Sequence, residues 1–148
     1  MHTLHIYKDY FPVLGGIENH IKVLAEAQVA IGHSVTVLVC DPGHRTHVRE
    51  MNGVKVIKAG RLGTVASMPL SARQWLNLCR QKPDIVHVQS PYPLGEVGAW
   101  LLKPRLPVVI SYQSDIVRQR RWLRFYGPLL RRVLRRADRI LVSTPRYL

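Results

Sequence analysis

Short apolar runs alternate along the chain with stretches in which apolar residues recur every three or four positions. Residues 35–39 and 107–110 are apolar almost throughout, which predicts strands buried on both faces, as in a parallel sheet. The pattern predicts strands near residues 3–7, 34–40, 54–58, 84–88, 107–112 and 139–143, and helices near 16–31, 71–81, 94–102 and 117–137. This alternation predicts an α/β domain with a doubly wound, mostly parallel sheet.

The whole chain, residues 1–148, is expected to form a single domain, because this length buries enough surface for a substantial core. One connection stays open, since no helical stretch separates the strand near 34–40 from the strand near 54–58. After the last predicted strand, Pro145 is typical of the first turn of a further helix. We therefore expect this domain to be a fragment or the first half of a larger protein.

The loop between the first strand and the first helix ends in two adjacent glycines, Gly15 and Gly16. Glycine lacks a Cβ, so the backbone can approach a ligand closely there. The helix that follows directs free N–H groups and the positive end of its dipole into the same space. This corner therefore predicts a binding site for a diphosphate, with a simple tight turn as the alternative.

In an open α/β sheet, ligands bind beyond the carboxyl ends of the strands, where the strand order reverses. With the usual strand order, the rim of this crevice would be formed by residues 8–16, 89–95 and 111–115. These segments bring hydroxyl, amide and carboxylate groups to one edge, among them Ser90, Tyr92, Gln113 and Asp115, and Glu18 follows the glycine corner in the first turn of the predicted helix. Simpler roles remain open, because Glu18 would favour the helix dipole and Asp115 could cap the next helix. His87 lies within an apolar run and is expected to be a hydrogen-bonded core residue.

The chain carries 22 Lys and Arg residues against nine Asp and Glu residues, a formal net charge of +13. This excess predicts an anionic partner. Between residues 118 and 139, arginines accompany an apolar stripe with helical spacing, and Arg131, Arg132, Arg135 and Arg136 are expected to face an anionic membrane surface. Nucleic acid would also suit such a face, but no nucleic-acid motif accompanies it, so this partner is disfavoured.

Other classes of protein are disfavoured by missing patterns. The chain has no cationic, then apolar, leader and no apolar run of about 20 residues, so we expect a cytoplasmic protein, at most peripheral on the inner face of the membrane. Cys40 and Cys79 are expected to be free thiols, and no residue spacing suggests a metal site. The dinucleotide fingerprint G-x-G-x-x-G is absent, although Asp41 lies roughly where a ribose-binding acid would be.

Five segments, in order along the chain, resemble the N-terminal domain of family 4 glycosyltransferases, which have the two-domain GT-B fold. The matching segments are residues 10–20, 31–37, 83–91, 107–117 and 137–143. The resemblance implies a Rossmann-like, acceptor-side domain of a retaining enzyme that transfers a sugar from a nucleotide-diphosphate donor to a lipid-linked or polysaccharide acceptor. It implies no cofactor beyond this donor substrate, and a donor-binding C-terminal domain that lies outside the chain.

The resemblance also assigns roles to residues. Gly15 and Gly16 match the glycines that approach the donor diphosphate, and Glu18 and Asn19 are candidates for acceptor contact, together with Ser90 and Tyr92 on the same rim. Gln113 and Asp115 are the catalytic candidates. Family members usually have histidine in the position of Gln113, and an amide can hydrogen-bond a sugar hydroxyl but cannot act as an acid or base.

Two expectations about activity follow. Because most donor-binding groups of the family belong to its C-terminal domain, we expect the isolated chain to have no measurable transferase activity. The alternative is a non-enzymatic binding module that uses its basic face for nucleic acid or a protein partner.

Overall fold

The computed structural model describes all residues except 66–67, 103–105, 114–119 and 143–148. Its strands are β1 (His2–Ile6), β2 (Ser34–Asp41), β3 (His47–Met51), β4 (Val54–Gly60), β5 (Gly63–Val65), β6 (Met68–Leu70), β7 (Ile85–Ser90), β8 (Val108–Tyr112) and β9 (Arg139–Val142). Its helices are α1 (Gly16–Ala30), α2 (Ala72–Arg80), α3 (Pro93–Leu102) and α4 (Arg120–Arg136).

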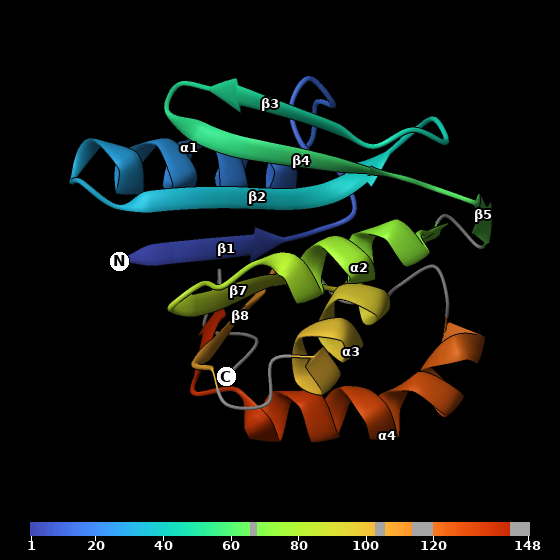
Figure 1. Cartoon of the computed structure of the whole chain (residues 1–148). Helices are drawn as coiled ribbons and strands as arrows, with labels where there is room; N and C mark the ends of the chain where they lie inside the picture. The colour runs from blue at the N-terminus through green and yellow to red at the C-terminus, as the bar shows by residue number, and fades with distance from the viewer. Residues whose placement is uncertain (66–67, 103–105, 114–119, 143–148) are drawn as a thin grey trace.

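Seven strands form the central sheet in the order β3-β4-β2-β1-β7-β8-β9 (Figure 1). All neighbours in this sheet are parallel except β3 and β4, which are antiparallel. The strand order reverses between β1 and β7, since β2 pairs with one side of β1 and β7 with the other. This confirms the doubly wound α/β fold and places the reversal where the sequence suggested it.

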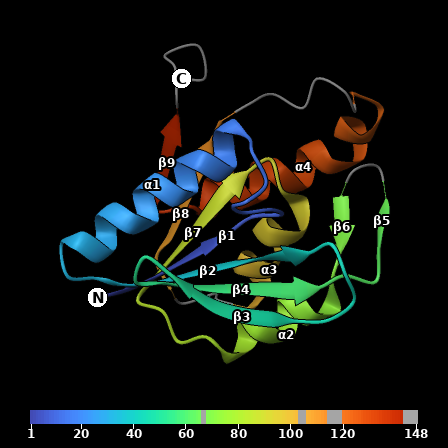
Figure 2. The ribbon, with the colours of Figure 1, turned by 90° about the horizontal axis from the view of Figure 1, so that it is seen from above.

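Helices cover both faces of the sheet: α1 lies on one face, and α2, α3 and α4 lie on the other (Figures 1 and 2). Neighbouring residues of β1 show this division directly. His5 reaches Gln28 of α1, whereas Ile6 lies beneath Gly95 of α3. A Cβ added to Gly95 would come within 3.0 Å of the Ile6 side chain and closer still to the Tyr92 ring, so this glycine lets α3 approach the sheet.

The six predicted strands and four predicted helices are all present, but the pattern missed three short strands. The connection after β2, which the sequence left undefined, contains the strand β3. This strand runs antiparallel to β4 at the edge of the sheet, and the turn at Asn52 and Gly53 joins the two. Both turn residues have positive φ, 51° and 77°. An Asn-Gly pair is a strong sequence signal for a two-residue hairpin, so the β3–β4 hairpin is predictable from the sequence. The small β5–β6 hairpin lies beyond the carboxyl end of β4 (Figure 2).

Candidate functional site at the carboxyl edge of the sheet

The candidate site lies at the carboxyl edge of the sheet, where the strand order reverses. The loop after β1 ends at Gly15 and Gly16, β7 ends at Ser90, and Gln113 follows β8. The Gln113 backbone N–H donates to the Ser90 carbonyl at 3.3 Å, which continues the pairing of β8 with β7 to the rim. The structure thus brings the glycine corner and Gln113 to the same edge, as the sequence predicted.

The two glycines differ in what surrounds them. A Cβ at Gly15 would collide with the Glu18 carboxylate, whereas a Cβ at Gly16 would meet no atom within 4 Å. Glu18 is buried, and it lies in the first turn of α1, whose N-cap is Gly15. The carboxylate therefore fills the space freed by Gly15, and the negative charge is favourable at the positive end of the helix dipole. Gly16 provides the open surface.

The loop before the glycines is held by lysine side chains. Lys58 of β4 donates to the Phe11 carbonyl at 2.9 Å, and the ammonium of Lys22 lies 5.8 Å from the centre of the Phe11 ring. Burial lowers the pKa of Lys58. Beyond this anchor, Leu14 is 90% exposed, and Asn19 is exposed on the first turn of α1. Asn19 is thus free to meet a ligand from solvent.

Gln113 is connected to a row of polar side chains on the α1 face of the sheet. Its Nε2 donates to Gln89 Oε1 at 2.8 Å, and Gln89 Nε2 lies 3.4 Å from His87 Nε2. The same His87 nitrogen lies 2.8 Å from Ser111 Oγ. Gln113 is half-buried, and the other three residues are buried. The prediction that His87 is a hydrogen-bonded core residue is confirmed.

A second buried histidine adjoins this row. The rings of His5 and His87 lie 5.0 Å apart, and His5 Nε2 contacts Gln28 Oε1 at 2.7 Å. His5 Nδ1 is buried without a partner among the described residues. Burial lowers the pKa of His5 to about 4 and that of His87 to about 3. Both imidazoles are therefore neutral near pH 7, so each has one N–H donor and one nitrogen acceptor.

Ser90 and Tyr92 lie deeper than the sequence suggested. Tyr92 is 1% exposed, and its hydroxyl donates to Gln74 Oε1, while Gln74 Nε2 donates to the Tyr7 carbonyl at 3.0 Å. Cys40 Sγ lies 3.6 Å from the same hydroxyl. Ser90 is fully buried, so both side chains belong to the packed interior rather than to an open rim. The covering helix explains their burial. Alternate side chains of a strand point to the same face of the sheet, and α3 covers the face concerned.

Glu96 is a buried carboxylate that the sequence did not single out. One oxygen accepts the Tyr92 backbone N–H at 3.1 Å, and the other accepts the Tyr126 hydroxyl of α4. Ser90 also interacts with this carboxyl group, without the geometry of a hydrogen bond. Burial raises the pKa of Glu96. Its position in the first turn of α3 was the available signal.

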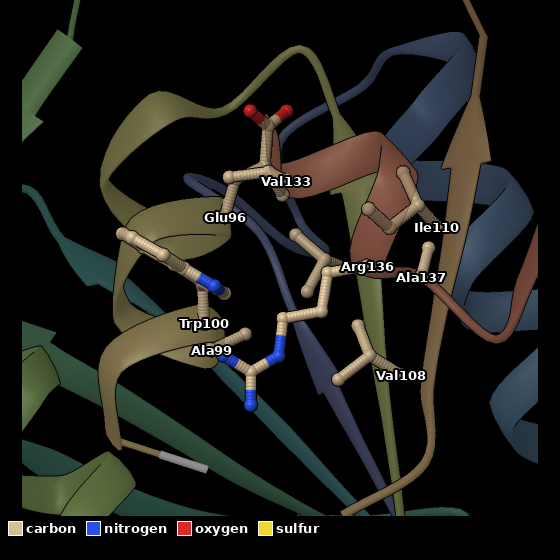
Figure 3. Close-up of a pocket in the computed structure, with 9 residues that line it drawn as sticks. Glu96, Ala99, Trp100, Val108, Ile110, Val133, Arg136 and Ala137 are labelled. Atoms are coloured by element: carbon tan, nitrogen blue, oxygen red, sulfur yellow. The ribbon is translucent and has the colours of Figure 1, made fainter. Parts of the chain in front are cut away.

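A small cavity opens beside Glu96, between α3, α4 and the sheet (Figure 3). Its volume of about 10 Å³ is too small for a sugar or a nucleotide. Arg136 extends from α4 toward Ala99 and Trp100, while the Glu96 carboxylate points away from its guanidinium (Figure 3). The cavity is therefore a gap in helix packing and not a substrate pocket.

The predicted membrane-facing arginines divide into two groups. Arg131, Arg132 and Arg135 are exposed and line one open concavity on α4, together with Pro128. Arg136 is also exposed, but it lines the small cavity beneath α3. Leu130 and Val133 of the same helix are buried, so the apolar stripe of α4 packs against the rest of the protein.

Asp115, a catalytic candidate, lies outside the described residues. Within the described part of the chain, no helix is both long and apolar enough to cross a membrane. The same part contains no group of three or more His, Cys, Asp or Glu side chains placed to hold a metal ion.

Two curated relatives are similar in sequence to almost the whole of this chain. It is 32% identical over 150 residues to the O-antigen chain mannosyltransferase C of Escherichia coli, covering 99% of this chain and 40% of that protein. It is 33% identical over 151 residues to a D-rhamnosyltransferase of Pseudomonas aeruginosa, covering 99% of this chain and 39% of that protein. The chain therefore spans about two fifths of the length of these relatives.

The fold and the family agree with this similarity. A sucrose-phosphate synthase from Thermosynechococcus elongatus has a similar fold, with a TM-score of 0.72 and 17% identity over 99% of this chain and 43% of that one. The family model of Glycosyltransferase Family 4 matches residues 14–146. The chain belongs to glycosyltransferase family 4.

Proposed function

We propose that this chain is the acceptor-side, N-terminal half of a retaining glycosyltransferase. The enzyme transfers a sugar from a nucleotide-diphosphate donor to a lipid-linked or polysaccharide acceptor in the cytoplasm. The observation that carries this proposal is the open Gly16 corner at the strand-order reversal, in a chain of glycosyltransferase family 4. The open backbone and the N-terminus of α1 offer N–H groups and positive potential to the donor diphosphate.

The roles of the other rim residues follow from their positions. Asn19 is exposed beside the glycine corner and contacts the acceptor. Gln113 contacts the transferred sugar through its amide, since its backbone lies at the rim and its side chain is anchored from below by Gln89. An amide orients a hydroxyl without exchanging protons, so Gln113 contributes positioning rather than acid–base catalysis.

The donor to test first is GDP-mannose, because two relatives, from Corynebacterium glutamicum and Mycobacterium tuberculosis, are GDP-mannose-dependent α-mannosyltransferases, 26% and 27% identical to this chain. The test uses a chimera in which this chain replaces the matching segment of the E. coli relative. Transfer of labelled mannose from GDP-mannose to a polyprenyl-diphosphate-linked saccharide is the readout. The chimera is expected to be active, and the isolated chain is expected to be inactive.

The sharpest variant for this test is Gly16→Val, because a Cβ at Gly16 meets no atom within 4 Å. Transfer by this variant is expected to fall at least tenfold, since the branched side chain stands where the diphosphate approaches. Gly127→Ala in α4 is the control, because a Cβ there also meets no atom within 4 Å. Equal activity of the two variants would argue against the diphosphate site.

We further propose that the concavity lined by Arg131, Arg132 and Arg135 contacts an anionic membrane surface on the cytoplasmic side. Each cation near such a surface contributes roughly 1 kcal/mol. Replacing the three arginines by glutamine is expected to abolish sedimentation with vesicles that contain anionic lipid. A control variant with the same charge change replaces exposed arginines elsewhere, namely Arg45, Arg49 and Arg73. Equal loss in both variants, or salt-sensitive DNA binding that only the first variant loses, would contradict the membrane assignment.

A further inference from the structure

In the row of polar side chains behind Gln113, the chemistry of each residue decides which group donates and which accepts in every hydrogen bond. We call this donor-to-acceptor order the direction of the row. The Nε2 group of a glutamine is an –NH₂ that only donates, and the Oε1 atom only accepts. Gln89 directs its Nε2 to His87 and its Oε1 to Gln113. Gln113 therefore donates one N–H inward through its own Nε2, and its carbonyl oxygen has no hydrogen-bond partner among the described residues.

The protonation of His87 sets the donor and acceptor roles along the row. Its Nε2 faces two groups that can donate, the amide of Gln89 at 3.4 Å and the hydroxyl of Ser111 at 2.8 Å. A nitrogen that accepts from either of them carries no proton, so the ring proton of the neutral imidazole lies on Nδ1. In the opposite tautomer, an Nε2–H would donate to the Ser111 hydroxyl at 2.8 Å and would face the Gln89 –NH₂ group at 3.4 Å. Relief of this contact between two donors would turn over the amides of both Gln89 and Gln113.

We propose that His87 and Gln89 are positioning residues, which hold Gln113 with its amide oxygen toward the substrate so that it accepts a hydrogen bond from a sugar hydroxyl. The inference rests on the proposed function for the identity of the ligand. The tautomer of a core histidine then decides which end of the rim amide the substrate meets. A substrate group that only accepts forms no hydrogen bond with the amide oxygen, because two acceptors cannot pair, and it is therefore disfavoured at that end of the amide.

Burial makes this arrangement rigid. Gln89 is 0% exposed and His87 is 4% exposed, so neither side chain has water available as an alternative partner. A buried amide that turned over would leave a donor facing a donor, which costs the desolvation of both groups. The amide of Gln113, which is only half-buried, is thereby oriented before the substrate arrives.

The first test is nitrogen NMR of the chain labelled with ¹⁵N in histidine and glutamine side chains. Near pH 7, the His87 ring is expected to carry its proton on Nδ1 and a bare Nε2, which the nitrogen shifts of the two tautomers distinguish. Gln89→Met is expected to shift both the His87 Nε2 signal and the Gln113 side-chain amide signal. The control is Gln74→Met, because Gln74 is equally buried but contacts Tyr92 and Tyr7. A protonated Nε2 in the unaltered chain would overturn the proposal, whether or not any transfer is found.

The second test measures mannose transfer by the chimera in a double-mutant cycle. Gln89→Met and Gln113→Met are each expected to lower kcat on the order of tenfold, and together no further, because Gln89 acts through Gln113. Gln74→Met should add its full effect to that of Gln113→Met. Additive losses for Gln89 and Gln113 would show that Gln89 only supports the fold and would overturn its positioning role. An inactive chimera would contradict the proposed function while the NMR result still decides the direction of the row.

Discussion

The two faces of the sheet at the strand-order reversal differ sharply, although the same strands form both. Toward α3, β1 presents Ile6 and β7 presents Val88, which pack in the apolar core. Toward α1, the intervening positions are His5, His87 and Gln89, which are equally buried but hydrogen-bonded. The first face is held by apolar burial, which has no preferred direction, and the second by contacts that fix orientation.

This difference separates the positions where buried polar groups orient one another from the positions where apolar packing stabilises the fold. Buried polar side chains stabilise little in net terms, but each fixes the orientation of its neighbour. On the α1 face, His5, His87 and Gln89 adjoin the row that leads to the rim through Gln113, whereas on the α3 face the buried polar groups Gln74, Ser90 and Glu96 lie beside the apolar packing of Ile6 and Val88. We therefore expect changes on the α3 face to alter stability and changes on the α1 face to alter ligand binding and turnover.

The largest expected effect is on the α3 face. Ile6→Ala removes a side chain that is 1% exposed and packs beneath Gly95, so the free energy of unfolding should fall by about 2–5 kcal/mol. Urea denaturation of the two proteins measures this difference. Val23→Ala on the exposed side of α1 is the control, with an expected change within about 0.5 kcal/mol. A loss for Ile6→Ala no larger than for the control would show that this face is not the main source of stability.

An intermediate effect is expected from acid, through His5 and His87. Their pKa values in the folded protein, about 4 and about 3, lie below the value of 6.5 expected in the unfolded chain. As the pH falls from 6.5 to 4, the unfolded state takes up protons that the folded state cannot, so the free energy of unfolding falls, by on the order of 1 kcal/mol per pH unit for each histidine. His5→Gln should flatten this decline, whereas His47→Gln, on the exposed β3 edge, should not.

Glu96 on the α3 face should respond in the opposite sense. Its pKa is raised by burial, so the folded state holds a proton that the unfolded state has released, and this contribution to stability grows as the pH falls through the raised pKa toward 4.5. Glu96→Gln should therefore make the acid-induced loss of stability steeper, as measured by thermal unfolding between pH 7 and 4.5. An unchanged slope would show that the two faces do not oppose each other in acid.

The smallest expected effect concerns ligand binding rather than folding. The Glu18 carboxylate fills the space beside Gly15. Its negative charge would repel the diphosphate that we propose to bind at Gly16. Glu18→Gln should tighten binding of inorganic pyrophosphate to the chain by roughly fivefold, or about 1 kcal/mol, as measured by calorimetry. The control is Glu26→Gln at the other end of α1, where the carboxylate pairs with Lys22 at 2.9 Å. Weaker binding by Glu18→Gln would mean that the carboxylate assists the ligand instead.

The sequence by itself determined the fold class, the order of the main strands and helices, and the family. The reason is that apolar periodicity and the segments around Gly15, Gly16 and His87 are local properties of the chain. It also indicated the edge of the sheet that forms the site, because the strand order of such folds follows from right-handed connections. The Asn52-Gly53 pair is a local signal for the β3–β4 hairpin, which apolar periodicity alone does not reveal.

The tertiary structure alone decided which candidate residues face the rim. Ser90 and Tyr92 turned out to be buried, and Glu18 turned back over Gly15, because burial depends on which helix covers a strand end. Gln89 and Glu96 could not be recognised as partners of Gln113 and Tyr126, since these pairs are 24 and 30 residues apart and meet only after the sheet and helices pack. Hydrogen-bond direction is set by such distant neighbours, whereas strand and helix formation is set by near ones.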